Sequence, residues 1–412
     1  MRIVLATVGT RGDVQPMLAL AQALARRGHA PLLACPDTFG AWVGSFGIEH
    51  APLGEDLQAM MREKGATFSR SLAGMKQYFA EQLLAQAPRL LELSNDADAI
   101  VGTAMAWSAP SIGEKRGIPA LELIPSSCVP SDMHPPPMMP FYGWPRWMNR
   151  VLWWLNDRIQ DSLMGHALNG ARAAIGLGPV RSFTRHLFLD TPGVLACDDA
   201  FLPPDPTWDP HWRYAGFLFL DDPTPLDPAL AAWLDAGDRP ICVGFGSMAG
   251  GHPERVGAML EAAIPRDRRC LVLGGAAELF AGRALPERFF AVASAPHPSL
   301  FPRCALVVHH GGSGTTAAAL RAGVPQVILP MLLDQFHHAH HLVRAGLGPR
   351  APSLAKVSTR ALERAIDEAL VWPEAPRRAM AARLEKSDAG GVITDHLAAL
   401  VRERGAHPPP AS

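Results

Sequence analysis

Short apolar segments alternate with helical patterns in the first part of the chain. Residues 3–8, 99–102 and 120–124 are apolar runs bounded by glycine, proline or polar residues, a pattern typical of strands buried in a parallel sheet. Residues 16–27 instead carry apolar side chains every three or four positions, with a proline near the start and Gly28 just past the end. This alternation predicts an α/β unit with a parallel sheet.

The alternation returns after residue 239 and predicts a second unit of the same kind. Its strands are expected at residues 241–245, 270–273, 305–309 and 326–329. Seven prolines fall within residues 202–228, a density that favours an irregular crossing between the units. We therefore expect an α/β fold of two Rossmann-like, doubly wound domains at 1–205 and 229–385, with a proline-rich linker at 206–228 and a C-terminal helix and flexible tail at 386–412.

The composition supports two globular domains and argues against a nucleic-acid-binding protein. A chain of 412 residues exceeds what one hydrophobic core usually organises, and 48% of it is hydrophobic. Its 38 basic and 39 acidic residues give a net charge of −1, which provides no electrostatic surface for a polyanion. The six cysteines are widely spaced and form no C-x-x-C pair, so reduced and mostly buried thiols are expected.

The apolar runs are too short for targeting or membrane-spanning segments. The first run leads straight into the glycine turn at residue 9, which leaves no room for a signal-peptide core. Elsewhere no stretch reaches the 18 or so apolar residues that a spanning helix needs. We therefore expect a cytoplasmic protein whose membrane contact is at most peripheral.

Residues 133–164 are rich in methionine and aromatic residues, with four tryptophans between residues 144 and 154. Such side chains form adaptable apolar surfaces. The segment is either an ordinary helix packed in the core, or an apolar surface that binds an acceptor or a membrane, although its sequence shows no basic face. On the second interpretation, the acceptor-binding residues are His134, Phe141 and Trp144.

The sequence V-H-H-G-G-S-G-T-T at residues 308–316 follows an apolar strand and opens a helical pattern. A strand, a glycine turn and a helix N-terminus together form an anion site, because free backbone N–H groups and the positive end of the helix dipole point at the ligand. Serine and threonine hydroxyls add donors, and a histidine donates to a phosphate oxygen. The alternative is a tight turn with a serine N-cap. The two histidines at the strand end favour the ligand site.

Longer motifs carry a resemblance to a known family. Together with this turn, residues 296–302, 321–325 and 330–335 resemble the donor-binding signature of family 1 glycosyltransferases, whose GT-B fold has two Rossmann-like domains facing each other across a cleft. G-T-R-G-D-V-Q-P at residues 9–16 resembles the first loop of the sterol and antibiotic glycosyltransferases. A third set of motifs is similar to the rhamnosyltransferases that build rhamnolipids, at residues 131–136, 176–179 and 214–217.

The resemblance implies a role for each motif residue. The N-terminal domain would bind the acceptor and the C-terminal domain the nucleotide sugar. Asp334 and Gln335 would hold the sugar hydroxyls, because carboxylate and amide groups match hydroxyls that both donate and accept. His297 would contact the base, and Gly246 with Ser247 would close over the phosphates. The diphosphate site would consist of His310 and the backbone amides of Gly312, Ser313, Gly314 and Thr315.

Two positions depart from the family pattern. Ser294 replaces the tryptophan that plant members stack under the base, so the base must be held otherwise. Ala318 replaces the glutamate with which many UDP-sugar enzymes bind both ribose hydroxyls. A 2′-hydroxyl at such a site would lack that hydrogen-bond partner. The second departure favours dTDP-sugars over UDP-sugars.

Asp13 is the expected catalytic base. An acceptor hydroxyl is a poor nucleophile until a carboxylate or an imidazole accepts its proton. Asp13 lies on the loop after the first strand, at the carboxyl edge of the sheet, where open α/β folds bind ligands. The alternative is a structural N-cap, because the residue directly precedes a helical pattern. The resemblance favours the base.

The sequence thus predicts an inverting glycosyltransferase that moves a hexose or deoxyhexose from a dTDP- or UDP-sugar to a hydroxyl of an apolar small molecule or lipid. No metal is expected. The D-x-D pattern at residues 96–98 precedes a strand, where a solvated turn is expected, and His337 with His341 lacks a third ligand. The alternatives are an α/β-hydrolase, which would need a G-x-S-x-G nucleophile, a silent sugar-nucleotide-binding partner and a sugar-nucleotide epimerase.

Overall fold

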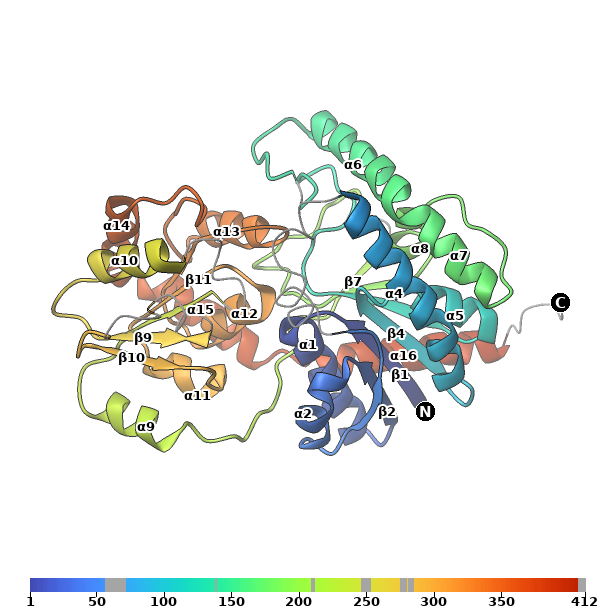
Figure 1. The fold of residues 1–412 in the computed structure, drawn as a ribbon, viewed down its shortest axis with the longest axis horizontal. Helices are drawn as coiled ribbons and strands as arrows, with labels where there is room; N and C mark the ends of the chain where they lie inside the picture. Colours follow the sequence, from blue (N-terminus) through green and yellow to red (C-terminus); the bar gives the residue numbers. More distant parts are fainter. Residues whose placement is uncertain are drawn as a thin grey trace.

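The structure, a computed structural model, describes residues 1–55, 72–137, 139–208, 212–245, 253–274, 280 and 285–406. Within these ranges the chain forms two α/β domains, each built on a sheet of parallel strands. Figure 1 shows the two domains side by side, with the N-terminal domain in blue and green. Gly246 and Ser247, expected to close over the phosphates, lie outside the described residues.

The N-terminal sheet has the strand order β3-β2-β1-β4-β5-β6-β7. Ile3 and Leu5 of β1 pack into one apolar cluster, whereas Val4 and Ala6 pack into another. Both faces of the strand are therefore covered, which explains its continuous apolar run. The strands are β1 (Arg2–Val8), β2 (Ala30–Cys35), β3 (Glu49–Pro52), β4 (Ala99–Ala104), β5 (Ala120–Ile124), β6 (Gly193–Leu195) and β7 (Trp212–Tyr214). The helices are α1 (Arg11–Arg26), α2 (Gly40–Gly44), α4 (Leu72–Leu93), α5 (Ala109–Arg116), α6 (Arg146–Gln160), α7 (His166–Ala174) and α8 (Phe183–Phe188).

The C-terminal sheet has the order β10-β9-β8-β11-β12. Leu306 and Val308 of β11 pack into one apolar cluster and Val307 into another, so this sheet is also covered on both faces. The strands are β8 (Ile241–Gly244), β9 (Cys270–Leu273), β10 (Phe289–Val292), β11 (Leu306–His309) and β12 (Gln326–Ile328). The helices are α9 (Pro228–Asp235), α10 (Pro253–Ala263), α11 (His297–Leu300), α12 (Ser313–Arg321), α13 (Gln335–Arg344), α14 (Thr359–Leu370) and α15 (Glu374–Glu385).

Both sheets reverse their strand order at one point, between β1 and β4 in the first and between β8 and β11 in the second. Open α/β sheets bind ligands outside the carboxyl ends of their strands at such switch points. The helices that follow β1 and β11 are α1 and α12, and these two helices are in contact. The two switch points therefore meet at the seam between the domains.

Helix α1 begins earlier than the sequence pattern predicts. It starts at Arg11, and Pro16 lies inside it, where proline gives up one backbone hydrogen bond. The pattern placed Pro16 in the first turn because proline is preferred there. Thr10 is the N-cap, and its hydroxyl accepts a hydrogen bond from Gly12 N at 3.2 Å. Asp13 is thus the third helical residue, and its expected alternative role as N-cap is wrong.

The expected linker at 206–228 is shorter in the structure. Its residues Trp212–Tyr214 form β7, which pairs with β6 at the edge of the N-terminal sheet. Residues 215–227 contain no helix or strand and lead to α9. A three-residue strand among prolines is too short to produce a periodic pattern, which is why the sequence did not reveal it.

The last helix, α16 (Ala389–Ala406), returns to the N-terminal domain and packs on α1. Figure 1 shows this red helix beside the blue strands. Gly390 permits the close approach, because a Cβ at this position would lie 2.3 Å from Ala23 Cβ. Arg27 of the first domain pairs with Asp388 at 3.2 Å and with Asp395 at 2.7 Å. The two ends of the chain are therefore joined in one domain.

Three smaller expectations concern the cysteines, the D-x-D pattern and membrane-spanning segments. All six cysteines are unpaired, and five of them are buried. The D-x-D residues form a turn before β4, in which Asp98 accepts a hydrogen bond from Arg2 N at 2.7 Å and Asp96 pairs with the Arg2 guanidinium. Of the helices in the described ranges, none has the length and apolar character to cross a bilayer.

Candidate active site

The turn after β11 is fixed by a glycine and two histidines. Gly311 has a φ of +95°, and a Cβ there would lie 2.6 Å from Ile328 Cγ2, so the turn requires glycine. His309 Nδ1 accepts a hydrogen bond from Gly311 N at 3.1 Å, and its Nε2 donates to Gln326 Oε1 at 2.9 Å. His338 Nδ1 donates to Gly311 O at 2.8 Å. The position of His338 one turn into the helix after Asp334 was a usable signal for this structural role.

Helix α12 presents its N-terminus at this turn. Gly312, not a serine, is the N-cap, and it supplies no side-chain hydrogen bond. The N–H groups of Ser313, Gly314 and Thr315 have no partner within the helix, because they belong to its first turn. The Ser313 hydroxyl donates to Pro125 O of the other domain at 2.7 Å. Backbone amides, rather than this hydroxyl, are therefore the donors available to an anion.

His310 lies beside these amides. It is partly buried, and its Nδ1 has no hydrogen-bond partner among the described residues. Burial lowers the pKa of His310, although the charge of Asp334 and the backbone of Gly244 act in the opposite direction. A neutral imidazole has one N–H, so His310 can donate to an incoming phosphate oxygen in the tautomer that carries its proton on Nδ1.

The loop before α13 holds the two residues expected to bind the sugar. Gln335 Oε1 accepts hydrogen bonds from Met331 N at 2.9 Å and Leu332 N at 3.1 Å, so this oxygen shapes the loop and only the NH₂ group remains for a sugar. Leu333 has a φ of +53°, an uncommon conformation for a non-glycine residue. Asp334 occupies the N-cap position of α13 without a side-chain cap bond, which leaves its carboxylate available to a ligand.

Asp13 faces this loop from the other domain. Its Oδ2 accepts hydrogen bonds from Thr10 N at 2.7 Å and Thr10 Oγ1 at 3.0 Å, and no other described residue donates to Oδ1. Burial raises the pKa of Asp13; the two Thr10 bonds lower it, and the negative charge of Asp334 raises it further. One oxygen is thus held by the helix start, and the other is free to accept a proton.

His297 stands at the start of α11 and stacks on Phe301, with ring centroids 4.4 Å apart. Burial lowers the pKa of His297 to about 4, and the charges of Arg11 and His310 lower it further. Arg11 belongs to the N-terminal domain, so His297 and His310 also lie at the seam. Ala318 on α12 packs against the apolar cluster that contains Phe301.

The expected acceptor residue His134 is enclosed by aromatic rings. It is buried, and its ring packs against those of Trp153, Trp208 and His337. Trp153 Nε1 donates to His134 O at 2.9 Å, which fixes the loop to the inner face of α6. His134 Nε2 has no hydrogen-bond partner within the described ranges. Burial lowers the pKa of His134 to about 4.

Phe141 and Trp144 lie elsewhere. Their rings stack 4.7 Å apart, and 46% and 42% of the two residues is exposed. They therefore form part of the outer surface in this structure and do not enclose His134. One face of α6 is buried and the opposite face is exposed, so the helix is packed in the core on one side only. Binding of an acceptor or a membrane by the exposed side stays a prediction.

The loop between β5 and α6 also touches the C-terminal domain. Ser127 Oγ lies 2.8 Å from His337 Nε2, and Tyr142 OH lies 3.3 Å from His337 Nδ1. The Tyr142 ring stacks on His340 at 4.3 Å. The sequence did not identify Ser127, because a lone serine in a loop carries no pattern. Among the described residues, no group of three side chains has a geometry suited to a metal ion.

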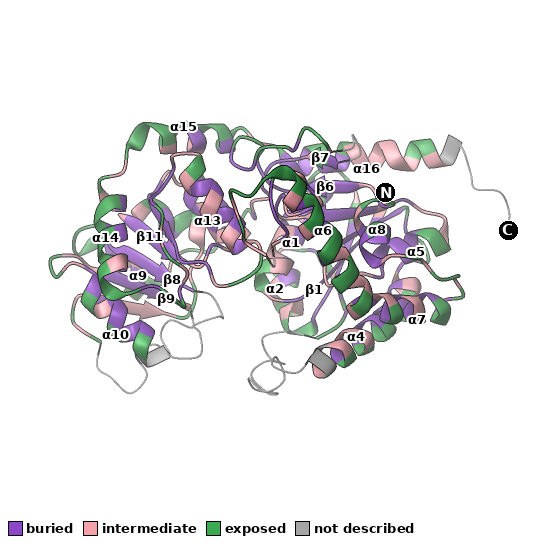
Figure 2. Ribbon diagram, turned by 90° about the horizontal axis from the view of Figure 1, so that it is seen from above, coloured by how far each residue is buried: buried purple, intermediate pink, exposed green. Residues whose placement is uncertain are grey.

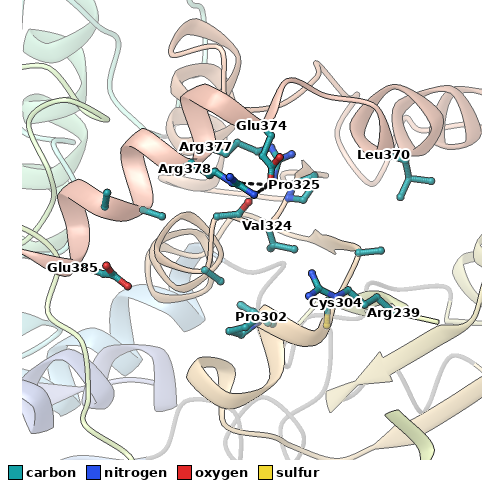
Figure 3. A pocket seen from close by; sticks show the side chains of 16 residues that line it. Arg239, Pro302, Cys304, Val324, Pro325, Leu370, Glu374, Arg377, Arg378 and Glu385 are labelled. Atoms are coloured by element: carbon teal, nitrogen blue, oxygen red, sulfur yellow. Dashed lines mark hydrogen bonds and ion pairs between the residues drawn. The ribbon is translucent and has the colours of Figure 1, made fainter. Parts of the chain in front are cut away.

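A separate pocket of about 440 Å³ lies in the C-terminal domain, lined by α15 and by the residues just before β8 and β12 (Figure 3). Its most prominent cation is already bound: the Arg377 guanidinium donates to the carbonyls of Gly323, Trp372 and Pro373. The residues before β8 and β12 mark the amino edge of the sheet, opposite the edge that carries His310. This pocket is distinct from the candidate site.

Comparisons with known proteins agree with this geometry. The family description "Glycosyltransferase family 28 N-terminal domain" matches residues 3–130, and "Erythromycin biosynthesis protein CIII-like, C-terminal domain" matches residues 259–393. Glycosyltransferase GtfE of Amycolatopsis orientalis is 34% identical over 97% of this chain and 96% of its own length. A vancomycin aglycone glucosyltransferase of the same organism is 34% identical over 84% of this chain and 85% of its own length. A sterol 3-beta-glucosyltransferase of Arabidopsis thaliana is 29% identical over 96% of this chain and 67% of its own length.

Solved structures match the fold. The glycosyltransferase of kitacinnamycin has a TM-score of 0.74 at 19% identity, covering 97% of this chain and 98% of that one. Glycosyltransferase VinC in complex with dTDP has a TM-score of 0.69 at 18% identity, covering 98% of this chain and all of that one. The hydrolase alternative is therefore wrong, and the resemblance to antibiotic and sterol glycosyltransferases is confirmed. The chain belongs to the GT-B glycosyltransferases, with a family 28 N-terminal domain and an EryCIII-like C-terminal domain, and it is a nucleotide-sugar-dependent glycosyltransferase.

Proposed function

We propose that the protein is an inverting, metal-independent enzyme that transfers a hexose or deoxyhexose from a dTDP- or UDP-sugar to a hydroxyl of an apolar small molecule or lipid. One observation carries this proposal: α1, with Asp13 in its first turn, contacts α12, whose free N-terminal amides form the expected diphosphate site. The expected base of one domain and the expected donor site of the other thus meet at the same seam.

The proposed step is a single displacement at the anomeric carbon. Asp13 Oδ1 accepts the proton of the acceptor hydroxyl as its oxygen bonds to the anomeric carbon. The bond from that carbon to the phosphate oxygen breaks, and its electron pair leaves with the nucleoside diphosphate. Attack from the face opposite the leaving group inverts the configuration. Because its surroundings raise the pKa of Asp13, the carboxylate has a greater proton affinity than one in water.

The leaving diphosphate would be stabilised by the α12 N-terminus and His310. The free backbone N–H groups of the first turn and the helix dipole both favour negative charge. With its proton on Nδ1, His310 adds a neutral donor. These groups supply the charge stabilisation for which other transferases use a metal ion held by a D-x-D motif. In this chain, the residues of that pattern bind Arg2 instead.

A preference for dTDP over UDP is proposed from Ala318. The residue packs against the apolar cluster around Phe301 and offers no acceptor for ribose hydroxyls. A ribose 2′-hydroxyl left without a partner there would weaken UDP binding. The solved structure of VinC contains dTDP, which supports the same preference.

An apolar acceptor is proposed from the aromatic residues around His134 and from the relatives. Trp153 and Trp208 form apolar walls against the His134 ring. The curated relatives are named for glycosylation of the vancomycin aglycone and of sterols, which are bulky acceptors with apolar parts.

The proposed reaction is tested by incubating the purified enzyme with dTDP- and UDP-sugars and a set of aglycone, sterol and hydroxy-fatty-acid acceptors, in the presence and absence of EDTA. We expect transfer that EDTA does not reduce, and a product whose anomeric coupling constant shows inversion relative to the donor. Loss of turnover with EDTA, restored by a divalent metal, contradicts metal independence. Retention of configuration contradicts the single displacement. Tighter calorimetric binding of UDP than of dTDP contradicts the preference drawn from Ala318.

A further inference from the structure

Helix α6 carries an exposed stripe in which large apolar residues and arginines are interleaved. Trp147 and Trp154 are 62% and 63% exposed, which is unusual for tryptophan on a folded protein. In Figure 2 the helix lies across the face turned to the viewer and is drawn mostly as exposed. The stripe extends along about 20 Å of the helix. We call it the outer face of α6, which consists of Arg146, Trp147, Arg150, Val151, Trp154, Leu155, Arg158 and Ile159.

The charges on the outer face are basic. Arg150 pairs with Asp132 at 3.2 Å, and the arginine side chain is 66% exposed whereas the aspartate is 20% exposed. Arg158 pairs with Asp157 at 3.0 Å and with Asp161 at 3.3 Å, and it is more exposed than either acid. In each of these pairs the cation points outward and the acid lies behind it. Arg146 has no ion-pair partner in the described part of the chain. The sequence did not reveal a basic face because the arginines lie on the same side of the helix as the exposed apolar residues. A separate basic side, opposite an apolar one, is therefore absent from the pattern.

A shallow groove of about 300 Å³ lies at the C-terminal end of the outer face. Arg158 and Lys76 of α4 line it together with Ile159, Ser162 and Leu163. Two cations beside two apolar side chains match the border between a lipid phosphate and its acyl chains. The combination of basic and apolar side chains on α6 therefore continues onto the neighbouring helix α4 through Lys76.

We propose that the outer face of α6 and this groove bind the surface of an anionic lipid bilayer. Tryptophan and large aliphatic residues enter the headgroup region, and arginine stems lie along apolar surface while their guanidinium groups reach lipid phosphates. The helix lies parallel to the bilayer because its apolar and basic residues share one side. A second copy of the chain fits less well, because pairing this face with itself would oppose arginines and the face presents no exposed acid to match them.

The outer face of α6 lies close to the expected acceptor residue His134, so membrane binding there would bring the bilayer near the candidate site. On the opposite side of α6, Trp153 donates to His134 O, and the His134 ring contacts His337 across the seam. Phe141 and Trp144, exposed on the loop that leads into α6, add two more aromatic rings next to the stripe. A bilayer on the outer face would lie one helix away from His134. The enzyme could thus receive an apolar acceptor directly from the membrane.

The proposal is tested by sedimentation with sucrose-loaded vesicles of phosphatidylcholine alone and of phosphatidylcholine with 30% phosphatidylglycerol, measured without substrate. We expect at least tenfold stronger binding to the anionic vesicles, reduced by 0.5 M NaCl because exposed charges are screened. The double variant Trp147→Ser/Trp154→Ser should lose at least tenfold in binding. Arg146→Glu should lose roughly 5- to 30-fold, since each basic residue near an anionic surface contributes about fivefold.

Matched control variants test whether the loss of vesicle binding is specific to the outer face of α6 or follows from changing any exposed apolar or basic residue. Val371→Ser and Arg360→Glu change an exposed apolar residue just after α14 and an exposed arginine within it, and both variants should bind vesicles like the wild type. Far-UV circular dichroism and urea midpoints confirm that all variants fold. Equal binding to neutral and anionic vesicles, absence of binding, or equal losses in the α14 controls would overturn the proposal. A concentration-dependent dimer that Trp147→Ser/Trp154→Ser abolishes, without vesicle binding, would assign the face to a second copy instead.

Discussion

At Asp13, the two carboxylate oxygens lie in different surroundings. Oδ2 accepts both Thr10 hydrogen bonds at the start of α1, whereas Oδ1 receives none from any other described residue. We predict that Asp13→Asn lowers turnover by about 10²- to 10⁴-fold, because the amide cannot accept the acceptor proton. The amide oxygen can still accept both Thr10 bonds, so the melting temperature should change by only a degree or two.

Three measurements on this variant separate a base from a helix cap: turnover, dTDP affinity by calorimetry and melting temperature. Asp96→Asn is the control, because it alters a surface carboxylate that binds Arg2 far from the seam. Turnover of Asp13→Asn close to that of the control would show that Asp13 is structural, and His134 would be the next candidate for the base.

His310 is expected to act on the donor alone. We predict that His310→Ala weakens nucleotide-sugar binding by about 10- to 100-fold, since a hydrogen bond to a charged group contributes about 1.5–3 kcal/mol. His310→Gln, which keeps an N–H donor, should recover part of the loss. Calorimetry with dTDP measures both variants. Donor affinities equal to that of the wild type would remove His310 from the diphosphate site.

Glu122 is an acid buried in the middle of β5, with no partner for Oε2 in the described structure. Burial raises its pKa from 4.5 to about 8, so the folded protein keeps a proton that the unfolded chain releases. Stability is therefore lost as pH rises from about 4.5 to 8, by up to about 1.4 kcal/mol per pH unit. We predict that Glu122→Gln matches the wild type near pH 4.5 and becomes progressively more stable above it. Urea unfolding at a series of pH values measures the difference, and parallel curves would contradict the assigned pKa.

At the scale of elements, the sequence predicts what depends on periodicity and glycine turns. β5 and β9 have the expected bounds, and the turn at Gly311 joins a strand to a helix as the motif implies. The orientation of polar side chains could not be predicted. The Ser313 hydroxyl points to Pro125 and the Gln335 oxygen to the Met331 loop, because each finds a backbone partner that is distant in sequence or set by the turn geometry. No local pattern encodes such contacts.

Ser313 of α12 allows a test of whether its hydroxyl binds phosphate, as the motif suggests, or a backbone carbonyl, as in the structure. If Ser313 bound phosphate, removing its hydroxyl would weaken donor binding about tenfold. Because the hydroxyl instead donates to Pro125 O, we predict that Ser313→Ala changes dTDP affinity by less than about twofold and lowers the free energy of unfolding by about 1 kcal/mol. Thr316→Ala is the matched control, since its hydroxyl donates within the same helix to Gly312 O. A tenfold loss in dTDP affinity for Ser313→Ala would contradict the assignment.

At the scale of the whole molecule, the sequence predicts two parallel-sheet domains but not how the chain ends connect them. α16 follows the C-terminal domain in sequence and packs on α1 of the first. The packing of α16 depends on the close approach of Gly390 to Ala23 and on the ion pairs of Arg27 with two aspartates. In each of these contacts the two residues are more than 350 positions apart in the sequence. The outer face of α6 was also hidden, because burial decides which of its tryptophans face solvent, and burial follows from the tertiary packing.

The seam between the domains contains a group of packed imidazoles. His134 of the N-terminal domain lies 4.6 Å from His337 of α13, and His337 lies 4.4 Å from His341, between ring centroids. Burial lowers the pKa of His134 to about 4 and of His341 to about 3, and that of His337 lies well below its usual value. Asp205 acts in the opposite direction on His134. At neutral pH the seam therefore contains uncharged rings.

These pKa values predict that the free energy of unfolding falls in acid. The unfolded chain protonates its histidines near pH 6.5, whereas the folded seam does so only near pH 4 or below, so stability present above pH 6.5 is lost as pH falls through this window. His134→Phe keeps a ring between Trp153 and Trp208 and removes one such group. We predict that it reduces the loss of unfolding free energy between pH 6.5 and 4.5 by up to about 1.4 kcal/mol per pH unit, as measured by urea unfolding. Tyr142→Phe changes the seam without removing a histidine and should keep the wild-type slope; a wild-type slope in His134→Phe would show that His134 is not a source of the acid sensitivity.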